Sequence, residues 1–201
     1  MALNKSALQS DLANVFSSME SNSDFASGIA SACKSYIENG EVTTEDGGTV
    51  SSGVFAGSGS GSVTVTDTLM SAPILTATAS MQSMTEGGDS VLASAIFSGL
   101  NAMIAVAVVE TDVTGVTTSP SGSPVPPSSG NAKGIGLSCT DSDFVSTLEG
   151  YFSDMQSMTE GGDDYFAEKL ADVIHTYIST GKVTTSGLEA LSGSAGSGEI
   201  A

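Results

Sequence analysis

Apolar side chains recur every three or four residues in blocks separated by polar turns, a spacing typical of one buried face of an α-helix. A short block begins the chain and returns near its end, with Leu8, Leu12, Val15, Phe16 and Met19, and then Phe144, Leu148, Tyr151, Phe152 and Met155. A longer block follows each, and the last contains Phe166, Leu170, Val173, Ile174, Tyr177 and Ile178. We therefore predict a short helix followed by a longer one that stops at Gly181.

Part of the sequence occurs more than once. The segment Met81–Asp89 is identical to Met155–Asp163, and apolar positions on both sides match at the same spacing. The amino-terminal residues also align with the last copy, pairing Phe25, Tyr36 and Gly40 with Phe166, Tyr177 and Gly181, and Phe16 with Phe152. The chain is thus predicted to consist of three related units.

The turn between the two helices of a unit reads Thr-Glu-Gly-Gly-Asp in two of the copies. Its glycine pair is expected to form a left-handed carboxyl-terminal cap, and Asp89 or Asp163 to cap the helix that follows. Each unit ends in a Gly/Ser-rich tail, which is either a short strand or a linker, and the alternation from Val63 to Thr66 favours a strand. The predicted fold is mainly α, with three repeated helical hairpins, each followed by a Gly/Ser-rich tail with short β-strands (α+β).

The boundaries follow from the repeat and from the prolines. We place unit 1 at residues 5–66, unit 2 at 67–116, a Pro/Ser/Gly-rich, semi-rigid connector at 117–130, the Gly-rich tail of unit 2 at 131–140, and unit 3 at 141–201. Pro73 is expected to shorten or kink its helix. A hairpin of this size buries little apolar surface alone, so the units are expected to pack on one another or on a partner. The residues expected at this packing surface or interface are Phe16, Phe25, Tyr36, Ile96, Met103, Phe152, Phe166 and Tyr177.

The stretch from Ser90 to Val109 carries no charged residue. Its length would suffice to cross a membrane. Ser94, Ser98 and Asn101 interrupt it, however, and the equivalent helices of the other units are ordinary amphipathic ones. We therefore expect a helix covered on most sides by its sister units, and no membrane association.

Composition narrows the partners. The 201 residues carry a formal charge of −18, with five lysines and no arginine, which excludes direct binding of nucleic acid phosphates. Only 14% of the residues are charged and 5% are aromatic, a profile more typical of assembly than of an enzyme cleft. Net charge by itself also serves solubility. The start of the chain has no apolar signal segment, so synthesis in a cytoplasm is expected.

Candidates for chemistry are few. His175 is the only histidine and is expected on a solvated helix face. Cys33 and Cys139 are expected as reduced thiols, with a disulfide between units left open. Glu86, Asp89, Glu160, Asp163 and Asp164 could supply oxygen ligands to Ca²⁺, but the order of an EF-hand is missing and helix capping is favoured.

Catalytic and nucleotide-binding patterns are also missing. Ser58 and Ser60 lie in Gly-Ser repeats without the strand-to-helix turn of a hydrolase nucleophile. The Gly-x-Gly segments lack the remaining parts of a dinucleotide or phosphate loop. A hydrolase using Asp163 and Asp164 is a weaker alternative, because adjacent acids at a helix start usually cap it. We predict no catalytic residue, no metal and no cofactor.

The segment from Phe166 to Val183 contains Leu-Ala-x-x-Ile-x-x-Tyr-Ile-x-x-Gly-x-Val and is followed by a Gly-x-Gly tail, while the chain starts Met-Ala-Leu-Asn-Lys-Ser-Ala-Leu. With these features the sequence resembles small virion structural proteins of tailed bacteriophages. Units 1 and 3 carry the resemblance, and unit 2 shares only the hydrophobic spacing. The chain departs from the single-unit forms in having three copies. The resemblance implies a structural role without an active site.

Two hypotheses for the function follow. The leading one is a non-enzymatic virion structural protein, made in the host cytoplasm, that docks on the capsid, neck or tail and contacts other virion proteins in a symmetric assembly or homo-oligomer. The alternative is a soluble helical-repeat adaptor that binds protein partners in a groove between hairpins.

Overall fold

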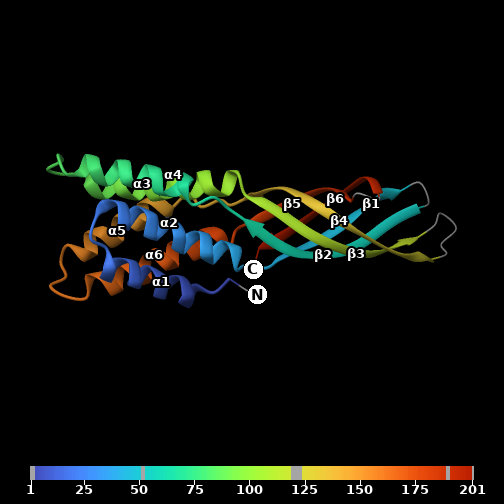
Figure 1. The fold of residues 1–201 in the computed structure, drawn as a ribbon, viewed down its shortest axis with the longest axis horizontal. Helices are drawn as coiled ribbons and strands as arrows, with labels where there is room; N and C mark the ends of the chain where they lie inside the picture. Colours follow the sequence, from blue (N-terminus) through green and yellow to red (C-terminus); the bar gives the residue numbers. More distant parts are fainter. Residues whose placement is uncertain (1–2, 51–52, 119–123, 189–190, 201) are drawn as a thin grey trace.

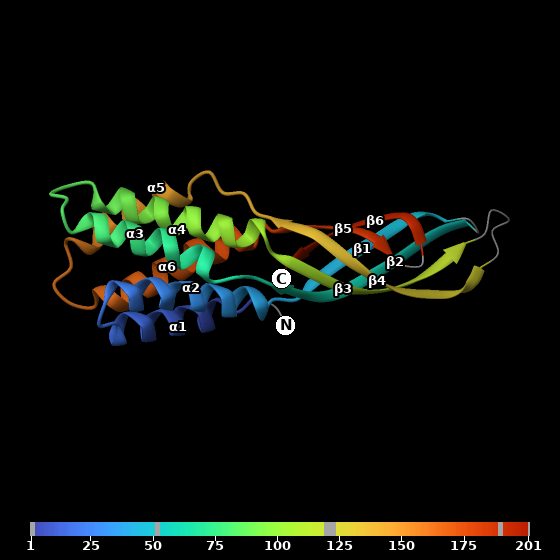
Figure 2. The same ribbon diagram turned by 45° about the horizontal axis from the view of Figure 1, so that its top comes forward.

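The computed structural model describes residues 3–50, 53–118, 124–188 and 191–200. Within these residues, six helices fill one half of an elongated molecule and six strands fill the other (Figures 1 and 2). The helices are α1 (Lys5–Ser18), α2 (Asn22–Glu38), α3 (Thr68–Met81), α4 (Gly88–Ala105), α5 (Phe144–Met155) and α6 (Gly162–Ile178). The strands are β1 (Val42–Val50), β2 (Gly53–Thr64), β3 (Val108–Thr118), β4 (Pro124–Ser138), β5 (Lys182–Leu188) and β6 (Leu191–Ile200). The fold is therefore mixed α+β and mainly helical, which confirms the fold class expected from the sequence at this level.

The helix starts explain where the chain turns. Asn4 caps α1 by accepting a hydrogen bond from the backbone N–H of Ala7 at 3.1 Å, and Ser21 caps α2 in the same way. In α4 and α6 the residues before the helix are Gly87 and Gly161, with φ of 81° and 75°. These left-handed conformations favour glycine.

The prediction for these two turns was wrong in its details. The left-handed glycine lies at the start of the second helix, rather than at the end of the first. The expected capping residues, Asp89 and Asp163, lie inside the first helical turn and make no capping hydrogen bond. A two-glycine turn brings the backbone into the helix without a side-chain cap, and the aspartates lie where their charge interacts favourably with the helix dipole.

The helices form a closed ring. Each helix packs on its neighbours in the chain, and α6 packs back on α1. Lys5 of α1 makes an ion pair with Asp172 of α6 at 2.7 Å on this closing contact. The second helices of the pairs are more enclosed than the first: α2, α4 and α6 bury seven, seven and eight residues, and α1, α3 and α5 bury three each.

The strands close in the same order as the helices. They form an antiparallel barrel, β1-β2-β3-β4-β5-β6, and β6 pairs with β1 to complete it. Next to the helices each strand contributes one buried aliphatic side chain, namely Val42, Val63, Val109, Leu137, Val183 and Ile200. This layer is continuous with the core of the helical bundle.

Glycine makes room for side chains inside the barrel. Thr44 is buried and lies between Gly59 of β2 and Gly198 of β6, its register partners on either side. Its hydroxyl donates to the carboxylate of Asp46, also buried, at 2.6 Å. A six-stranded barrel is narrow, so an inward side chain on one strand requires a small residue on the next. The Gly/Ser-rich tails form strands of the barrel, and their glycines fit its narrow interior.

Most of the residues expected to form the proline-rich connector at 117–130 lie in strands. Residues 117–118 end β3 and residues 124–130 belong to β4, while 119–123, with Pro120, lie outside the described residues. The prolines fit a strand because the recorded pairs between β4 and β5 begin only at Ala132, and the register with β3 shifts around Pro126 and Pro127. Proline is tolerated where no ladder hydrogen bond is needed from its nitrogen.

Two predictions concern the second helical pair. Pro73, which was expected to shorten or kink its helix, lies inside α3; α3 has 14 residues, as many as α1, so the proline does not shorten it. Helix α4, which carries no charged residue after Asp89, is not covered on most sides. Its buried residues form one face, as in α2 and α6, and Ser90, Ser94, Ser98 and Asn101 are exposed on the other.

Candidate functional site

The side chains expected at a packing surface or interface lie in the helical bundle. Phe25 is partly buried, and the other seven are buried: Phe16, Tyr36, Ile96, Met103, Phe152, Phe166 and Tyr177. Rings from different helices contact one another, since Phe16 stacks on Phe166 with 4.9 Å between ring centroids, and Phe152 lies 5.1 Å from the same ring. The seven buried residues hold the helices together and are not accessible to a partner.

Two tyrosine hydroxyls connect the second helices of the three pairs. Tyr36 of α2 is hydrogen-bonded to Nδ1 of His175 in α6, and Tyr177 of α6 donates to Oδ1 of Asn101 in α4 at 3.2 Å. In the sequence alignment of the units, Tyr36 corresponds to Tyr177 and His175 to Asn101. The same contact is thus made in two places. Burial raises the pKa of both phenols, that of Tyr177 to about 12.

His175 does not lie on a solvated helix face. It is half-buried at the contact between α6 and α2, and its ring lies edge-on to that of Tyr36, with 6.1 Å between the centroids. The sequence did not show this because the contact depends on how two distant helices pack. A base in nucleophilic catalysis is hydrogen-bonded to its nucleophile. Here the imidazole is hydrogen-bonded to a phenol whose pKa is raised by burial.

Both cysteines are free thiols. Cys33 is buried in α2, and Cys139 is half-buried in the segment between β4 and α5. Burial raises the pKa of each thiol to about 12. Because the thiolate is the reactive form, neither group is a nucleophile near neutral pH.

The acidic residues considered as Ca²⁺ ligands lie at the turns between paired helices. Asp89 accepts a hydrogen bond from the amide of Gln156 at 2.7 Å, and Asp163 and Asp164 lie in the first turn of α6. Within the part of the chain that the structure describes, no group of three or more His, Cys, Asp or Glu side chains is placed to hold a metal ion. The position of these carboxylates is consistent with favourable interaction with the helix dipoles.

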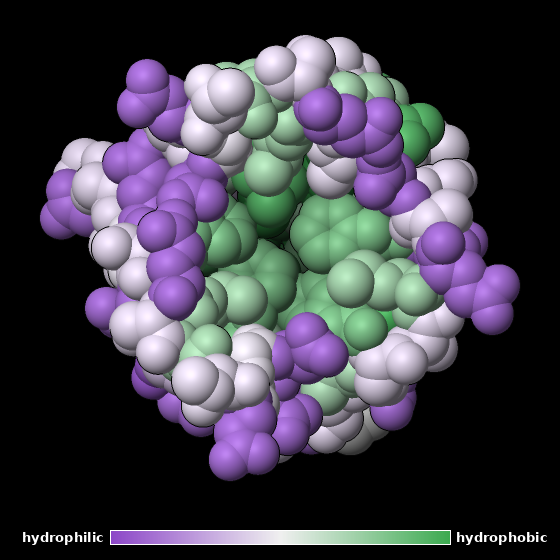
Figure 3. Space-filling view, turned by 90° about the vertical axis from the view of Figure 1, so that its left-hand side faces the viewer, coloured by the Kyte–Doolittle hydropathy of each residue, from purple (hydrophilic) through white to green (hydrophobic). Residues whose placement is uncertain are grey.

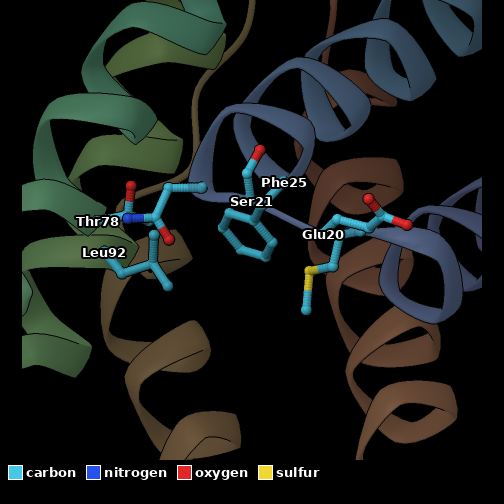
Figure 4. A pocket seen from close by; sticks show the side chains of 7 residues that line it. Glu20, Ser21, Phe25, Thr78 and Leu92 are labelled. Atoms are coloured by element: carbon cyan, nitrogen blue, oxygen red, sulfur yellow. The ribbon is translucent and has the colours of Figure 1, made fainter.

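An apolar hollow opens at the end of the bundle that carries the helix-to-helix turns. It has a volume of about 360 Å³ and is lined by Met19, Glu20, Ser21, Asn22, Phe25, Thr78 and Leu92. These residues come from the α1–α2 turn, α2, α3 and α4. Figure 4 shows Thr78 and Leu92 on one side of the gap, and Ser21 and Phe25 on the other.

The hollow has a cause that can be traced to single residues. At the spacing of the identical segments, Thr78 and Leu92 correspond to Phe152 and Phe166. Phe152 and Phe166 fill the bundle where they occur, and the ring of Phe166 contacts both Phe152 and Phe16. The second helical pair therefore lacks aromatic volume at this level, and a gap opens beside it. Sequence reasoning missed Thr78, although its alignment with Phe152 was the available signal.

The rim of this end is acidic. Figure 3 shows apolar surface gathered around the centre of the end and hydrophilic surface around it. The turns and the adjacent helix ends contain eight carboxylates and no lysine in residues 18–26, 81–92 and 154–165: Glu20, Asp24, Glu86, Asp89, Asp154, Glu160, Asp163 and Asp164. The end thus combines an apolar hollow with a negative surround.

Among the described residues, α4 is long and apolar enough to cross a membrane. Only 39% of its eighteen residues are buried, but a helix that forms part of a soluble core meets the same criterion of length and composition. The buried face of α4 packs into the same core as the other helices.

No protein-family model, curated protein or solved structure matches this chain.

Proposed function

We propose that the chain is three copies of one helix-helix-strand-strand unit, fused in tandem and arranged around a common long axis. The order of elements supports this, because helix, helix, strand, strand occurs three times in succession. The equivalent tyrosine contacts to His175 and Asn101 support it further. The three units differ in detail, so the symmetry is approximate.

On this basis we propose that the protein is a non-enzymatic structural subunit of a tailed bacteriophage particle. It would dock on the capsid, neck or tail and reach the particle after synthesis in the host cytoplasm. The observation that carries the proposal is ring closure, in which α1 packs on α6 and β1 pairs with β6. A closed, elongated body with three similar sides suits a position on a symmetry axis of a larger assembly. The sequence resemblance to small virion proteins points to the kind of assembly.

The chemistry of the side chains agrees with a structural role. The thiols of Cys33 and Cys139 have raised pKa values and are not reactive near neutral pH, and His175 is engaged with Tyr36. The apolar hollow is lined by one carboxylate, Glu20, without a second titratable group beside it in the lining. A general acid and base in concert would require two such groups.

Ring closure also disfavours the adaptor hypothesis. A helical-repeat adaptor is an open array, in which the terminal units face solvent and the stack presents a long concave surface. In this chain the first and last units contact each other through both the helices and the strands. A peptide groove running between hairpins would need the ring to open.

The experiment is quantitative mass spectrometry of density-purified phage particles from cells that produce the chain. We expect the chain in the particles at a fixed molar ratio to a major shell or tail protein, and the ratio should survive a high-salt wash. A chain found only in the soluble fraction, as a monomer, would contradict the proposal and favour the adaptor.

A further inference from the structure

We propose that the apolar hollow at the turn end of the bundle is a docking site for a basic protein segment that inserts one aromatic side chain. The site is the volume bounded by Met19, Phe25, Thr78 and Leu92, with Glu20 at its edge. The inference rests on the proposed structural function, because it assumes that the chain binds other proteins. It adds the place on the chain where a partner binds and the chemical character of that partner.

The shape of the hollow indicates the inserted group. In the other two units, phenylalanines stand where this unit has Thr78, namely Phe16 and Phe152. Those rings pack at 4.9–5.1 Å from Phe166, which is the arrangement an inserted ring would adopt beside Phe25. A phenyl group supplied by a partner would therefore replace the missing one in a frame already built for it.

The charge of the rim indicates what flanks that group. Glu20 lies at the hollow itself, Asp24 lies in the first turn of α2, and Glu86 lies in the turn between α3 and α4. Lysine or arginine on either side of the aromatic anchor would find opposite charge, which speeds association and selects the partner. A second copy of this chain would bring its own acidic end to the same place and be repelled.

The approximate symmetry makes the site single. Thr78 and Leu92 replace phenylalanine only in the second unit, so the hollow forms beside α3 and α4 and is filled at the equivalent positions. The proposal therefore predicts one segment bound per chain. A site created by the symmetric end as a whole would bind three.

The test uses the full chain and a fluorescently labelled probe peptide, Lys-Lys-Gly-Phe-Gly-Lys-Lys, titrated at low ionic strength. Two matched peptides serve as controls, one with serine in place of phenylalanine and one with glutamate in place of every lysine. We expect one-to-one binding by the probe, at least tenfold weaker binding by the serine peptide, and none by the glutamate peptide. Binding should also weaken as salt is raised.

Two variants locate the site. Thr78→Phe fills the hollow from within and should abolish binding while leaving the melting temperature equal to or above that of the parent. Thr76→Phe adds the same ring at an exposed position of α3 and should bind as the parent does. Glu20→Lys, at an exposed residue, should weaken binding at least tenfold without changing the fold, and it supplies a readout if Thr78→Phe does not fold.

Three results would overturn the proposal. The first is equal binding of the phenylalanine and serine peptides, which would mean simple charge attraction. The second is binding that survives both Thr78→Phe and Glu20→Lys. The third is dimerisation of the chain that Thr78→Phe abolishes, which would make the occupant a second copy. If the chain is found in particles but the peptide does not bind, the proposed structural function is supported and the docking site is refuted. If the peptide binds but the chain is absent from particles, the docking site is supported and the structural function is refuted.

Discussion

Gly61 gives the sharpest mechanical test of the barrel. It lies in β2, opposite Thr111 of β3. A Cβ atom at this position would lie 1.8 Å from the backbone oxygen of Glu110 and 2.7 Å from the Cα of Thr111. Backbone atoms cannot rotate away as a side chain can, so in Gly61→Ala the two strands must separate by more than an ångström.

The cost combines overpacking with weakened ladder hydrogen bonds. Overpacking typically costs about 1–3 kcal/mol, and each lost hydrogen bond about 0.5–1.5 kcal/mol. We expect the free energy of unfolding of Gly61→Ala to fall by about 3 kcal/mol, which for a chain of this size lowers the melting temperature by roughly 6–12 °C. The assay is thermal unfolding followed by circular dichroism, with urea unfolding as a second measure.

Gly150→Ala is the matched control. Gly150 is exposed in the middle of α5, and a Cβ there would meet nothing within 4 Å. Alanine is a better helix former than glycine, so this variant should gain about 0.5–1 kcal/mol. If Gly61→Ala melts at or above the temperature of the parent protein, β2 and β3 are not paired in this register and the barrel is wrong.

The remaining predictions concern the buried polar groups. Burial raises the pKa of Cys33 and Cys139 to about 12. Iodoacetamide at pH 8 should therefore alkylate both thiols at least about a hundredfold more slowly in the native protein than in urea. Equal alkylation rates in the two conditions would refute their burial. These thiols and Tyr177 have higher pKa values in the folded than in the unfolded chain. Their contribution to stability is therefore complete below about pH 8.5 and is lost as the pH rises towards 12. Melting temperatures measured across pH 8–12 will check this loss. Tyr177→Phe removes the hydrogen bond to Asn101 and should cost about 0.5–1.5 kcal/mol in urea unfolding, and no change would mean that the contact does not form. Burial acts to raise the pKa of Glu38, but hydrogen bonds from the Lys34 side chain and the Val65 N–H outweigh it and hold that pKa below its usual value. Glu38→Gln should therefore lower stability above about pH 4.3, and the difference from the parent should shrink as the pH falls further, through the lowered folded-state pKa.

Local patterns were sufficient to predict the helices. Leu8, Leu12 and Phe16 are the buried residues of α1, and Phe144, Leu148 and Phe152 are those of α5, as the three- and four-residue spacing indicates. Helix periodicity is encoded within a few turns of chain, so it can be read without knowledge of the neighbours.

The barrel could not be read in this way. Its inner positions include Gly59 and Gly198, whose role appears only when strands far apart in the sequence are paired around Thr44. A strand whose inner face is glycine shows no alternation of apolar and polar residues. The prolines of β4 misled for a related reason, because they lie where the recorded pairing to β5 has not yet begun.

The candidate site was hidden for a different reason. The aligned units pair Thr78 with Phe152, but a missing aromatic ring becomes a hollow only if the units pack around a shared centre. Of the eight residues expected at a packing surface or interface, seven are buried in the core of the bundle and Phe25 is partly buried. The acidic rim at the turn end could not be predicted either, because it forms only when turns far apart in the sequence come together at the same end of the bundle.

Closure of the ring is the central claim, and carbodiimide cross-linking tests it directly. The reagent joins a lysine amine to a carboxylate in contact with it. Lys5 and Asp172 are 2.7 Å apart across the contact of α1 with α6, with side chains 45% and 31% exposed. Lys182 and Glu199, 2.8 Å apart within the β5–β6 hairpin, form the control pair, which does not depend on closure. We predict that a dilute, monomeric sample yields both cross-links in the peptide map; the hairpin cross-link without Lys5–Asp172 would mean that the ring is open.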